Sequence, residues 1–219
     1  MKAVEELSSI AAEVSVCTNC ALHLSRKNAV PGEGPAEAEI MFIGEGPGFH
    51  ENEQGRPFVG AAGQFLDQLL TQAGLKRPDV WITNIVKCRP PANRDPLPEE
   101  IDACNSYLER QIKVINPKII ISLGRLSMAN YLPRAKIGLV HGQMHKVGGR
   151  FFIPMYHPAA ALHQGSLKPV ILADFARLPE LLKFARNELN ESGETSGSHP
   201  ETQNQTNVPE DEPKQLNLF

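Results

Sequence analysis

The sequence has no apolar run of about 18 residues, the length that a membrane-spanning helix needs. Its opening segment, MKAVEELSSIAAEV, has the pattern of an amphipathic helix and lacks the apolar centre of a signal peptide. Only four cysteines occur in the 219 residues. We therefore expect a cytoplasmic monomer without membrane contact, whose cysteines are free thiols or metal ligands rather than disulfides.

The last part of the chain has few apolar residues. Residues 188–214 contain no aromatic side chain and cannot bury enough apolar surface to offset their chain entropy. We expect a disordered acidic linker there, after a single domain at 1–187. Residues 188–219 hold seven acidic side chains and one lysine, whereas the preceding residues hold 21 basic and 18 acidic ones. The domain is thus weakly basic, which suits a polyanionic partner without identifying one.

Short apolar runs alternate with helical patterns along the domain. The apolar runs predict strands at 39–44, 80–86, 117–124 and 151–156, and Gly148-Gly149 predicts a hairpin turn. Apolar residues at helical spacing predict helices at 60–75, 97–115, 125–132 and 169–187. Such alternation is typical of a mainly parallel sheet that is covered by helices. We predict a three-layer α/β/α fold with a central, mainly parallel, four-stranded sheet.

Polar or glycine-rich residues lie at or just beyond the ends of three of the predicted strands. GEGPG (44–48) follows the first strand, Asn84 lies within the second, and His157 follows the fourth. Functional groups of parallel sheets gather beyond the carboxyl ends of the strands, so we predict the active site there. Each segment alone also has an ordinary structural interpretation. The glycines could form a phosphate-binding turn, Asn84 could cap a turn, and His157 could be a structural histidine.

The four cysteines have the spacing of a shared metal site. A CxxC pair at 17–20 lets two thiolates reach one metal or cluster, and two separated cysteines complete the set. The proposed ligands are Cys17, Cys20, Cys88 and Cys104. Spacing alone does not decide between zinc and a [4Fe–4S] cluster. The role that we favour is structural, and the site could orient nearby cations such as Lys87 and Arg89 toward a DNA phosphate.

Taken together, the segments resemble the iron–sulfur, or family 4, uracil-DNA glycosylases. The motifs GEGPG, GRPFVG-AAG, the asparagine of ITN, KCRPP-NRDP, the cysteine at 104 and HPAA occur in the order that this family shows. The resemblance covers about residues 14–187 and is specific as a combination. It implies a uracil-DNA glycosylase fold, a [4Fe–4S] cluster on the four cysteines, and excision of uracil from DNA.

The resemblance also implies roles for individual residues. Phe58 matches the aromatic residue that stacks on the flipped-out base, and Asn84 would pair with N3–H and O4 of uracil. His157 would donate a hydrogen bond to uracil O2 as the base leaves. The backbone of the turn at Gly46 and Gly48 would line the same site.

The residue that positions the attacking water is less directly indicated. Gly46 stands where the best-known branch of the superfamily has an aspartate, so Glu45 is the first candidate and Glu51 the second. Glu51 could instead crowd the C5 position of the base and exclude the methyl group of thymine. In the loop after His157, Leu162 is the candidate wedge that enters the DNA minor groove, or else a core leucine of a short helix.

The chain ends in QLNLF, an apolar peptide after a polar linker. It resembles the QLxLF peptide by which bacterial replication and repair proteins bind the sliding clamp. The residues concerned are Gln215, Leu216, Leu218 and Phe219. Such a terminus could alternatively pack on its own domain.

Three other functions are compatible with parts of the pattern. One is a cluster-bearing module that binds DNA or the clamp and has an inactive pocket, although Asn84, Phe58 and His157 are all present. Another is a superfamily branch that traps its product covalently through a histidine after the second strand, but KCRPPANRDP contains none. The third is a zinc protein with an unrelated hydrolase activity.

Overall fold

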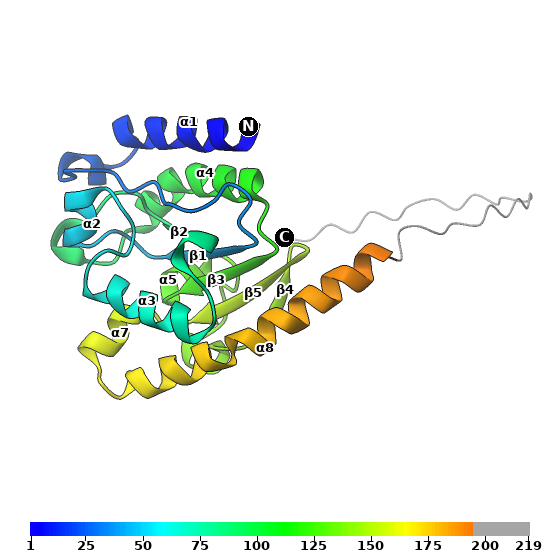
Figure 1. Cartoon of the computed structure of the whole chain (residues 1–219). Helices are drawn as coiled ribbons and strands as arrows, with labels where there is room; N and C mark the ends of the chain where they lie inside the picture. The colour runs from blue at the N-terminus through cyan, green and yellow to red at the C-terminus, as the bar shows by residue number, and fades with distance from the viewer. Residues whose placement is uncertain (195–219) are drawn as a thin grey trace, which may run out of the picture.

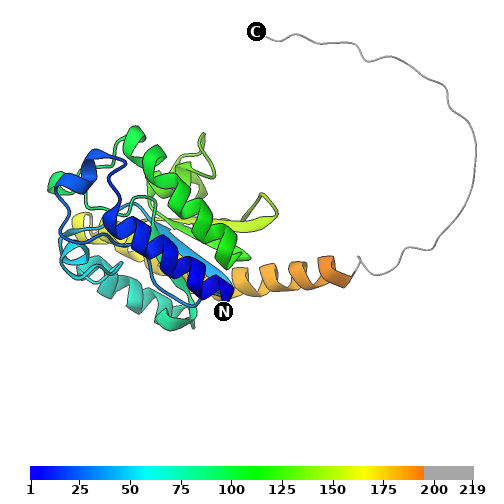
Figure 2. The same cartoon turned by 90° about the horizontal axis from the view of Figure 1, so that it is seen from above.

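The computed structural model describes residues 1–194. Most of the predicted linker and the whole QLNLF peptide therefore lie outside the described residues. The last helix of the domain, α8 (Leu167–Glu194), continues past residue 187, where the sequence placed its end. Its final turns project beyond the sheet (Figures 1 and 2).

The centre of the fold is a five-stranded sheet in the order β2-β1-β3-β5-β4. The strands are β1 (Ile40–Gly44), β2 (Trp81–Asn84), β3 (Ile119–Leu123), β4 (His145–Val147) and β5 (Arg150–Met155). The first four in spatial order are parallel, and only β4 is antiparallel to its neighbour. The predicted parallel sheet is confirmed, with one strand more than the four expected.

The additional strand arises from the predicted hairpin. Gly148 and Gly149 both adopt positive φ, at 56° and 77°, which a tight two-residue turn between antiparallel strands requires. This turn brings Val147 opposite Arg150, so the short segment β4 joins the sheet at its edge.

Helices cover both faces of the sheet (Figure 1). They are α1 (Lys2–Val16), α2 (Phe49–Gln54), α3 (Ala61–Gln72), α4 (Pro98–Ile115), α5 (Arg125–Ala129), α6 (Ile137–Val140), α7 (Pro158–His163) and α8. Because side chains alternate along a strand, Ile40 and Phe42 of β1 pack in the core with α3, α7 and α8. Met41 and Ile43 pack in the opposite core with α1, α4 and α5. The three-layer α/β/α prediction is confirmed.

No helix within residues 1–194 is long and apolar enough to cross a membrane.

Candidate active site

A cavity of about 260 Å³ opens beyond the carboxyl ends of β1, β2 and β5. Its walls come from the loop after β1, the end of β2, segment 90–96 and the start of α7. All the residues that the sequence singled out for catalysis or base binding line it: Glu45, Gly46, Gly48, Glu51, Phe58, Asn84 and His157. Residues far apart in the sequence thus meet in one slot at the edge where the parallel strands end.

Asn84 ends β2 and is almost completely buried, with 1% of its surface exposed. Its Oδ1 atom has no hydrogen-bond partner within the described part of the chain. A buried acceptor without a partner costs about 1–3 kcal/mol, which is typical of a group whose partner is a ligand. The parallel register sets Asn84 opposite Gly44. A Cβ atom on Gly44 would lie 2.4 Å from Oδ1 of Asn84 and 2.6 Å from Cζ of Phe58, so only glycine fits there.

Phe58 adopts a left-handed backbone conformation with a φ of 50°. This conformation is rare for a bulky side chain and persists only where the surroundings enforce it. Arg77 provides one restraint, because its guanidinium donates to the carbonyl oxygens of Pro57 and Phe58. Gly63 provides another, since a Cβ atom there would lie 1.9 Å from the carbonyl oxygen of Phe58.

His157 caps the N-terminus of α7 through its ring. Nδ1 accepts a hydrogen bond from the backbone N–H of Ala159 at 3.1 Å. A neutral imidazole whose Nδ1 is an acceptor has its proton on Nε2. Desolvation lowers the pKa of His157 to about 4, against the opposing effect of the Glu51 charge. The ring stacks on Phe58 with a centroid distance of 5.4 Å. The pocket therefore contains a neutral imidazole with one N–H available as a donor.

Glu51 has an unexpected structural part in the site. Its Oε1 accepts from the backbone N–H groups of Val59 and Gly60, at 2.8 and 2.9 Å, and its Oε2 accepts from Gly48 at 3.1 Å. The carboxylate thus ties the loop after β1 to the loop of Phe58. Since Pro47 lacks an N–H and that of Gly48 donates to Glu51, the 46–48 turn has only the N–H of Gly46 to offer a ligand.

Glu45 is held differently. One of its carboxylate oxygens, Oε1, accepts from the backbone N–H of Leu126 at 2.8 Å. Burial raises the pKa of Glu45, although this hydrogen bond opposes the effect. A carboxylate in a pocket with a raised pKa is a better proton acceptor near neutral pH than an exposed one.

Leu162 lies on α7 beside the cavity-lining residues Ala159 and His163 and is 54% exposed. Its exposure excludes the core position that was the alternative to a DNA wedge.

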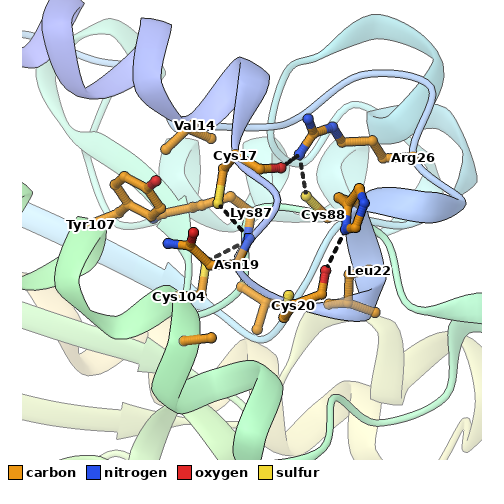
Figure 3. Close-up of a pocket in the computed structure, with 13 residues that line it drawn as sticks. Val14, Cys17, Asn19, Cys20, Leu22, Arg26, Lys87, Cys88, Cys104 and Tyr107 are labelled. Carbon is orange, nitrogen blue, oxygen red and sulfur yellow. Dashed lines mark hydrogen bonds between the residues drawn. The ribbon is translucent and has the colours of Figure 1, made fainter.

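The four cysteines line one second pocket on the other side of β2 (Figure 3). Cys17 directly follows α1, Cys20 precedes a short 3-10 helix at Ala21–Leu24, Cys88 lies after β2, and Cys104 lies in α4. Within residues 1–194 no three His, Cys, Asp or Glu side chains are arranged to hold a single metal ion. Thiolates of an iron–sulfur cluster bind different iron atoms and stand further apart than the ligands of one zinc ion.

Hydrogen-bond donors surround the cysteine sulfurs. The backbone N–H of Lys87 donates to Sγ of Cys104 at 3.3 Å, and the Arg26 guanidinium donates to Sγ of Cys88 at 3.6 Å (Figure 3). The lining also contains apolar side chains, among them Val14 and Leu22, and the polar residues Asn19, His23 and Tyr107. Buried thiolates with N–H donors fit the environment of an iron–sulfur cluster.

The expectation that Lys87 faces a DNA phosphate is wrong. Its side chain is 1% exposed and points into the protein, where burial lowers its pKa to about 8 against the opposing effect of Cys104. Arg89 remains at the surface, with its guanidinium 5.3 Å from the centroid of the Phe49 ring.

Two arginines with structural parts in these sites were not predicted. Arg77, which restrains the Phe58 loop, also forms ion pairs with Glu33 and Asp67 at 2.9 Å. Arg26 reaches the cysteine pocket from a loop between Cys20 and β1. Neither lies in a motif, and their partners are 9 to 62 residues away in the sequence, so no local signal could have identified them.

Comparison with known proteins gives consistent matches. The family model of the uracil DNA glycosylase superfamily matches residues 31–177. A type-4 uracil-DNA glycosylase of Saccharolobus solfataricus is 49% identical over 191 residues, which cover 82% of this chain and 88% of that protein. A type-4 uracil-DNA glycosylase of Sulfurisphaera tokodaii is 47% identical, over 81% of this chain and 86% of that protein. One of Thermotoga maritima is 43% identical, over 82% and 96%.

Proposed function

Because the chain belongs to the uracil DNA glycosylase superfamily, in its type-4 branch, we propose that it excises uracil from DNA and so begins base excision repair. The observation that supports this most strongly is the meeting of Asn84, Phe58 and His157 in one pocket. The reaction is hydrolysis of the bond between C1′ of the sugar and N1 of the base. Water adds to C1′, the bonding electrons leave with the base, and the products are uracil and an abasic site.

The base must first leave the duplex. Extrusion of a nucleotide costs a few kcal/mol, and stacking on an aromatic ring returns about 1–3 kcal/mol. Phe58, held in its strained conformation, supplies that ring. Leu162, exposed beside the pocket, would enter the minor groove and hinder return of the base.

Asn84 would select uracil. Its carbonyl oxygen accepts from N3–H and its amide donates to O4. Cytosine presents an unprotonated N3 and an amino group at these positions, so both hydrogen bonds would be lost, at about 1–3 kcal/mol each. The buried Oδ1 of Asn84, which has no partner elsewhere in residues 1–194, supports this role.

His157 would stabilise the departing base. As the glycosidic bond breaks, negative charge accumulates on uracil, and an Nε2–H aimed at O2 interacts with it most strongly in the transition state. Glu45 would orient the water and accept its proton after the sugar has gained cationic character. The raised pKa of Glu45 and the three backbone hydrogen bonds of Glu51 favour Glu45 for this step.

We further propose that a [4Fe–4S] cluster binds at the four cysteines. The gathering of all four cysteines in one pocket and the N–H donors at Cys88 and Cys104 support this assignment, as does the resemblance to the iron–sulfur family. When bound, the cluster would join three segments of the chain rather than take part in the chemistry. Brown colour and visible absorbance of the purified protein, together with about four iron atoms per chain, would test this assignment.

We also propose that residues 215–219 bind the sliding clamp, with residues 188–214 as the tether. A flexible chain of about 27 residues spans roughly 30 Å, enough for the catalytic domain to reach DNA beside the clamp. The benefit would come from a higher local concentration of enzyme, with the contacts in the active site unchanged.

The function is tested by substrate specificity. Oligonucleotides with U:G, U:A, T:G and hypoxanthine pairs are incubated with the wild type and with Asn84→Ala. We expect the wild type to release uracil but no thymine, and the variant to lose at least about tenfold in kcat/KM on uracil.

The control is Asn130→Ala, which removes an exposed asparagine far from the pocket residues and should retain wild-type rates. Equal release of thymine and uracil, or full activity of Asn84→Ala, would contradict the proposal.

A further inference from the structure

Lys87 lies between the two sites of the protein. It follows Asn84 by three residues and directly precedes Cys88. Its backbone N–H donates to Cys104, and its side chain lines the cysteine pocket (Figure 3). The mechanism proposed above does not use this buried side chain.

The hydrogen bonds of Lys87 determine its charge. Nζ lies 2.6 Å from Oγ1 of Thr83, 2.8 Å from the backbone oxygen of Asn84 and 2.8 Å from Oε1 of Gln111. The Thr83 hydroxyl donates its own proton to the carbonyl oxygen of Pro31, so toward Lys87 it acts as an acceptor. The amide oxygens are also acceptors. Three acceptors need three N–H donors, which only the charged ammonium has.

This ammonium has no carboxylate partner in the described part of the chain, since all three of its partners are neutral. A buried charge without a counter-charge is strongly unfavourable. Negative charge close to Lys87 would come from the cysteine pocket, because metal ligation keeps cysteines as thiolates and an iron–sulfur cluster with four thiolates is anionic overall.

We propose that Lys87 is the buried counter-charge of the cluster and, through the same ammonium, the positioning residue of Asn84. The hydrogen bond to the Asn84 backbone oxygen fixes the residue whose side chain enters the pocket. Binding of the cluster and alignment of the base-reading amide are therefore coupled through one side chain. The positioning half of this proposal rests on the proposed function, and the counter-charge half rests only on the cluster.

Two substitutions separate the two halves. Lys87→Met removes both the charge and the hydrogen bond to Asn84. Gln111→Glu places a carboxylate where the amide oxygen of Gln111 lies, 2.8 Å from Nζ. The new carboxylate neutralises the charge of the ammonium but leaves the hydrogen bond from Lys87 to Asn84. The hydrogen bond that the Gln111 amide donates to the carbonyl oxygen of Pro31 is lost in this variant. The matched control is Lys113→Met, which removes an exposed lysine from the same helix α4.

Cluster-loaded proteins are compared by two measurements. The first is the rate at which visible absorbance disappears in the presence of an iron chelator. The second is kcat and KM for uracil release, per cluster-containing molecule. We expect Lys87→Met to lose the cluster at least about tenfold faster and to have at least about tenfold lower kcat with unchanged KM. Gln111→Glu should also lose the cluster faster while its kcat stays near that of the wild type, and Lys113→Met should match the wild type in both.

Loss of the cluster from Lys87→Met at the wild-type rate would overturn the counter-charge, and a wild-type kcat would overturn the positioning role. If Lys87→Met does not fold, Gln111→Glu provides the test. An unchanged rate of cluster loss in Gln111→Glu overturns the counter-charge role. A kcat that falls by the same factor as the rate of cluster loss rises overturns the separate positioning role. If the cluster-loaded wild type releases no uracil, the proposed function fails, but the rates of cluster loss still test the counter-charge.

Discussion

Among the single residues of the pocket, His157 is held in the protonation state that the proposed mechanism requires. The Ala159 N–H occupies Nδ1, and burial keeps the pKa of the ring near 4, below its usual 6.5. In the proposed mechanism the donor toward the base is therefore the N–H of a neutral ring. A neutral donor stabilises the departing anion without requiring an acidic solution.

This arrangement predicts the pH dependence of the single-turnover rate. A histidine with a lowered pKa stays neutral as the pH falls through 6.5, so its titration should cause no change of rate there. The rate should fall at lower pH when Glu45 is protonated, at a value above the usual 4.5 of a glutamate. Glu45→Gln should lower the rate and remove this acidic limb, whereas Glu51→Gln should not remove it. A rate that rises on acidification through pH 6.5 would indicate a protonated imidazole instead.

The Asn84 amide and the Phe58 ring both pack directly against the backbone of Gly44. In Gly44→Ala the new methyl group would overlap with Oδ1 of Asn84 and with Cζ of Phe58, so both side chains must shift into the cavity that they line. We expect a loss of at least about tenfold in kcat/KM, with the fold retained by far-UV circular dichroism. Gly165→Ala, at an open position, is the control. Normal kinetics of Gly44→Ala would mean that the two side chains are not fixed against this residue.

At the scale of elements, the shape of the candidate active site depends more on the loops beyond the strand ends than on the strands themselves. The loop around Phe58 lies between α2 and α3 and is held by Arg77 from one side and by Glu51 from the other. Both restraints act on backbone groups. They hold Phe58 in its left-handed conformation and offset its cost of about 1–3 kcal/mol.

Removal of Arg77 should release this loop. In Arg77→Ala, Phe58 is free to leave its left-handed conformation, so the stacking surface for the base is no longer preformed. We expect KM for uracil-containing DNA to rise by about five- to tenfold, and the melting temperature to fall by a few degrees. Arg56→Ala is the control, because it also breaks an ion pair with Glu33 but makes no contact with the loop carbonyls. Similar effects in both variants would assign the change to the charge of Glu33 alone.

At the scale of the whole molecule, the cysteine pocket joins three segments that are distant in the sequence. The end of α1, the loop after β2 and the middle of α4 meet there, and α1 otherwise packs mainly on α4. The segment that starts at the last residue of β2 has Asn84 at one end and Cys88 at the other. One short segment, residues 84–88, therefore lines the candidate active-site pocket at one end and the cysteine pocket at the other.

Deletion of residues 215–219 tests the role of the C-terminal peptide. The variant should lose binding to the sliding clamp, measured by surface plasmon resonance, because the apolar side chains that would insert into the clamp are gone. Uracil excision from short oligonucleotides should remain at the wild-type rate, because the pocket lies entirely in the catalytic domain. Equal clamp binding by the full-length and shortened proteins would refute the proposal.

The sequence by itself determined the layered fold and the segments that form the pocket. Apolar runs and helical periodicity are local properties, so strands such as β1 and helices such as α4 could be placed from them. The positions of Asn84, His157 and the GEGPG segment at or beyond strand ends followed from the topology of parallel sheets, whereas Phe58 was assigned only through the family resemblance. The hairpin turn was also visible, although its short partner strand was not counted.

Only the tertiary structure decided what these residues do to one another. The contact of buried Lys87 with Gln111 and the hydrogen bond of Arg77 to the Phe58 carbonyl depend on partners 24 and 19 residues away in the sequence. The partners of Glu51 in the next loop are only 8 and 9 residues away, but the folding of that loop determines their contact. A charged side chain next to a cysteine motif looks the same in a sequence whether it faces DNA or the core. Its environment is fixed by the packing of β2 against α4, which no local pattern contains.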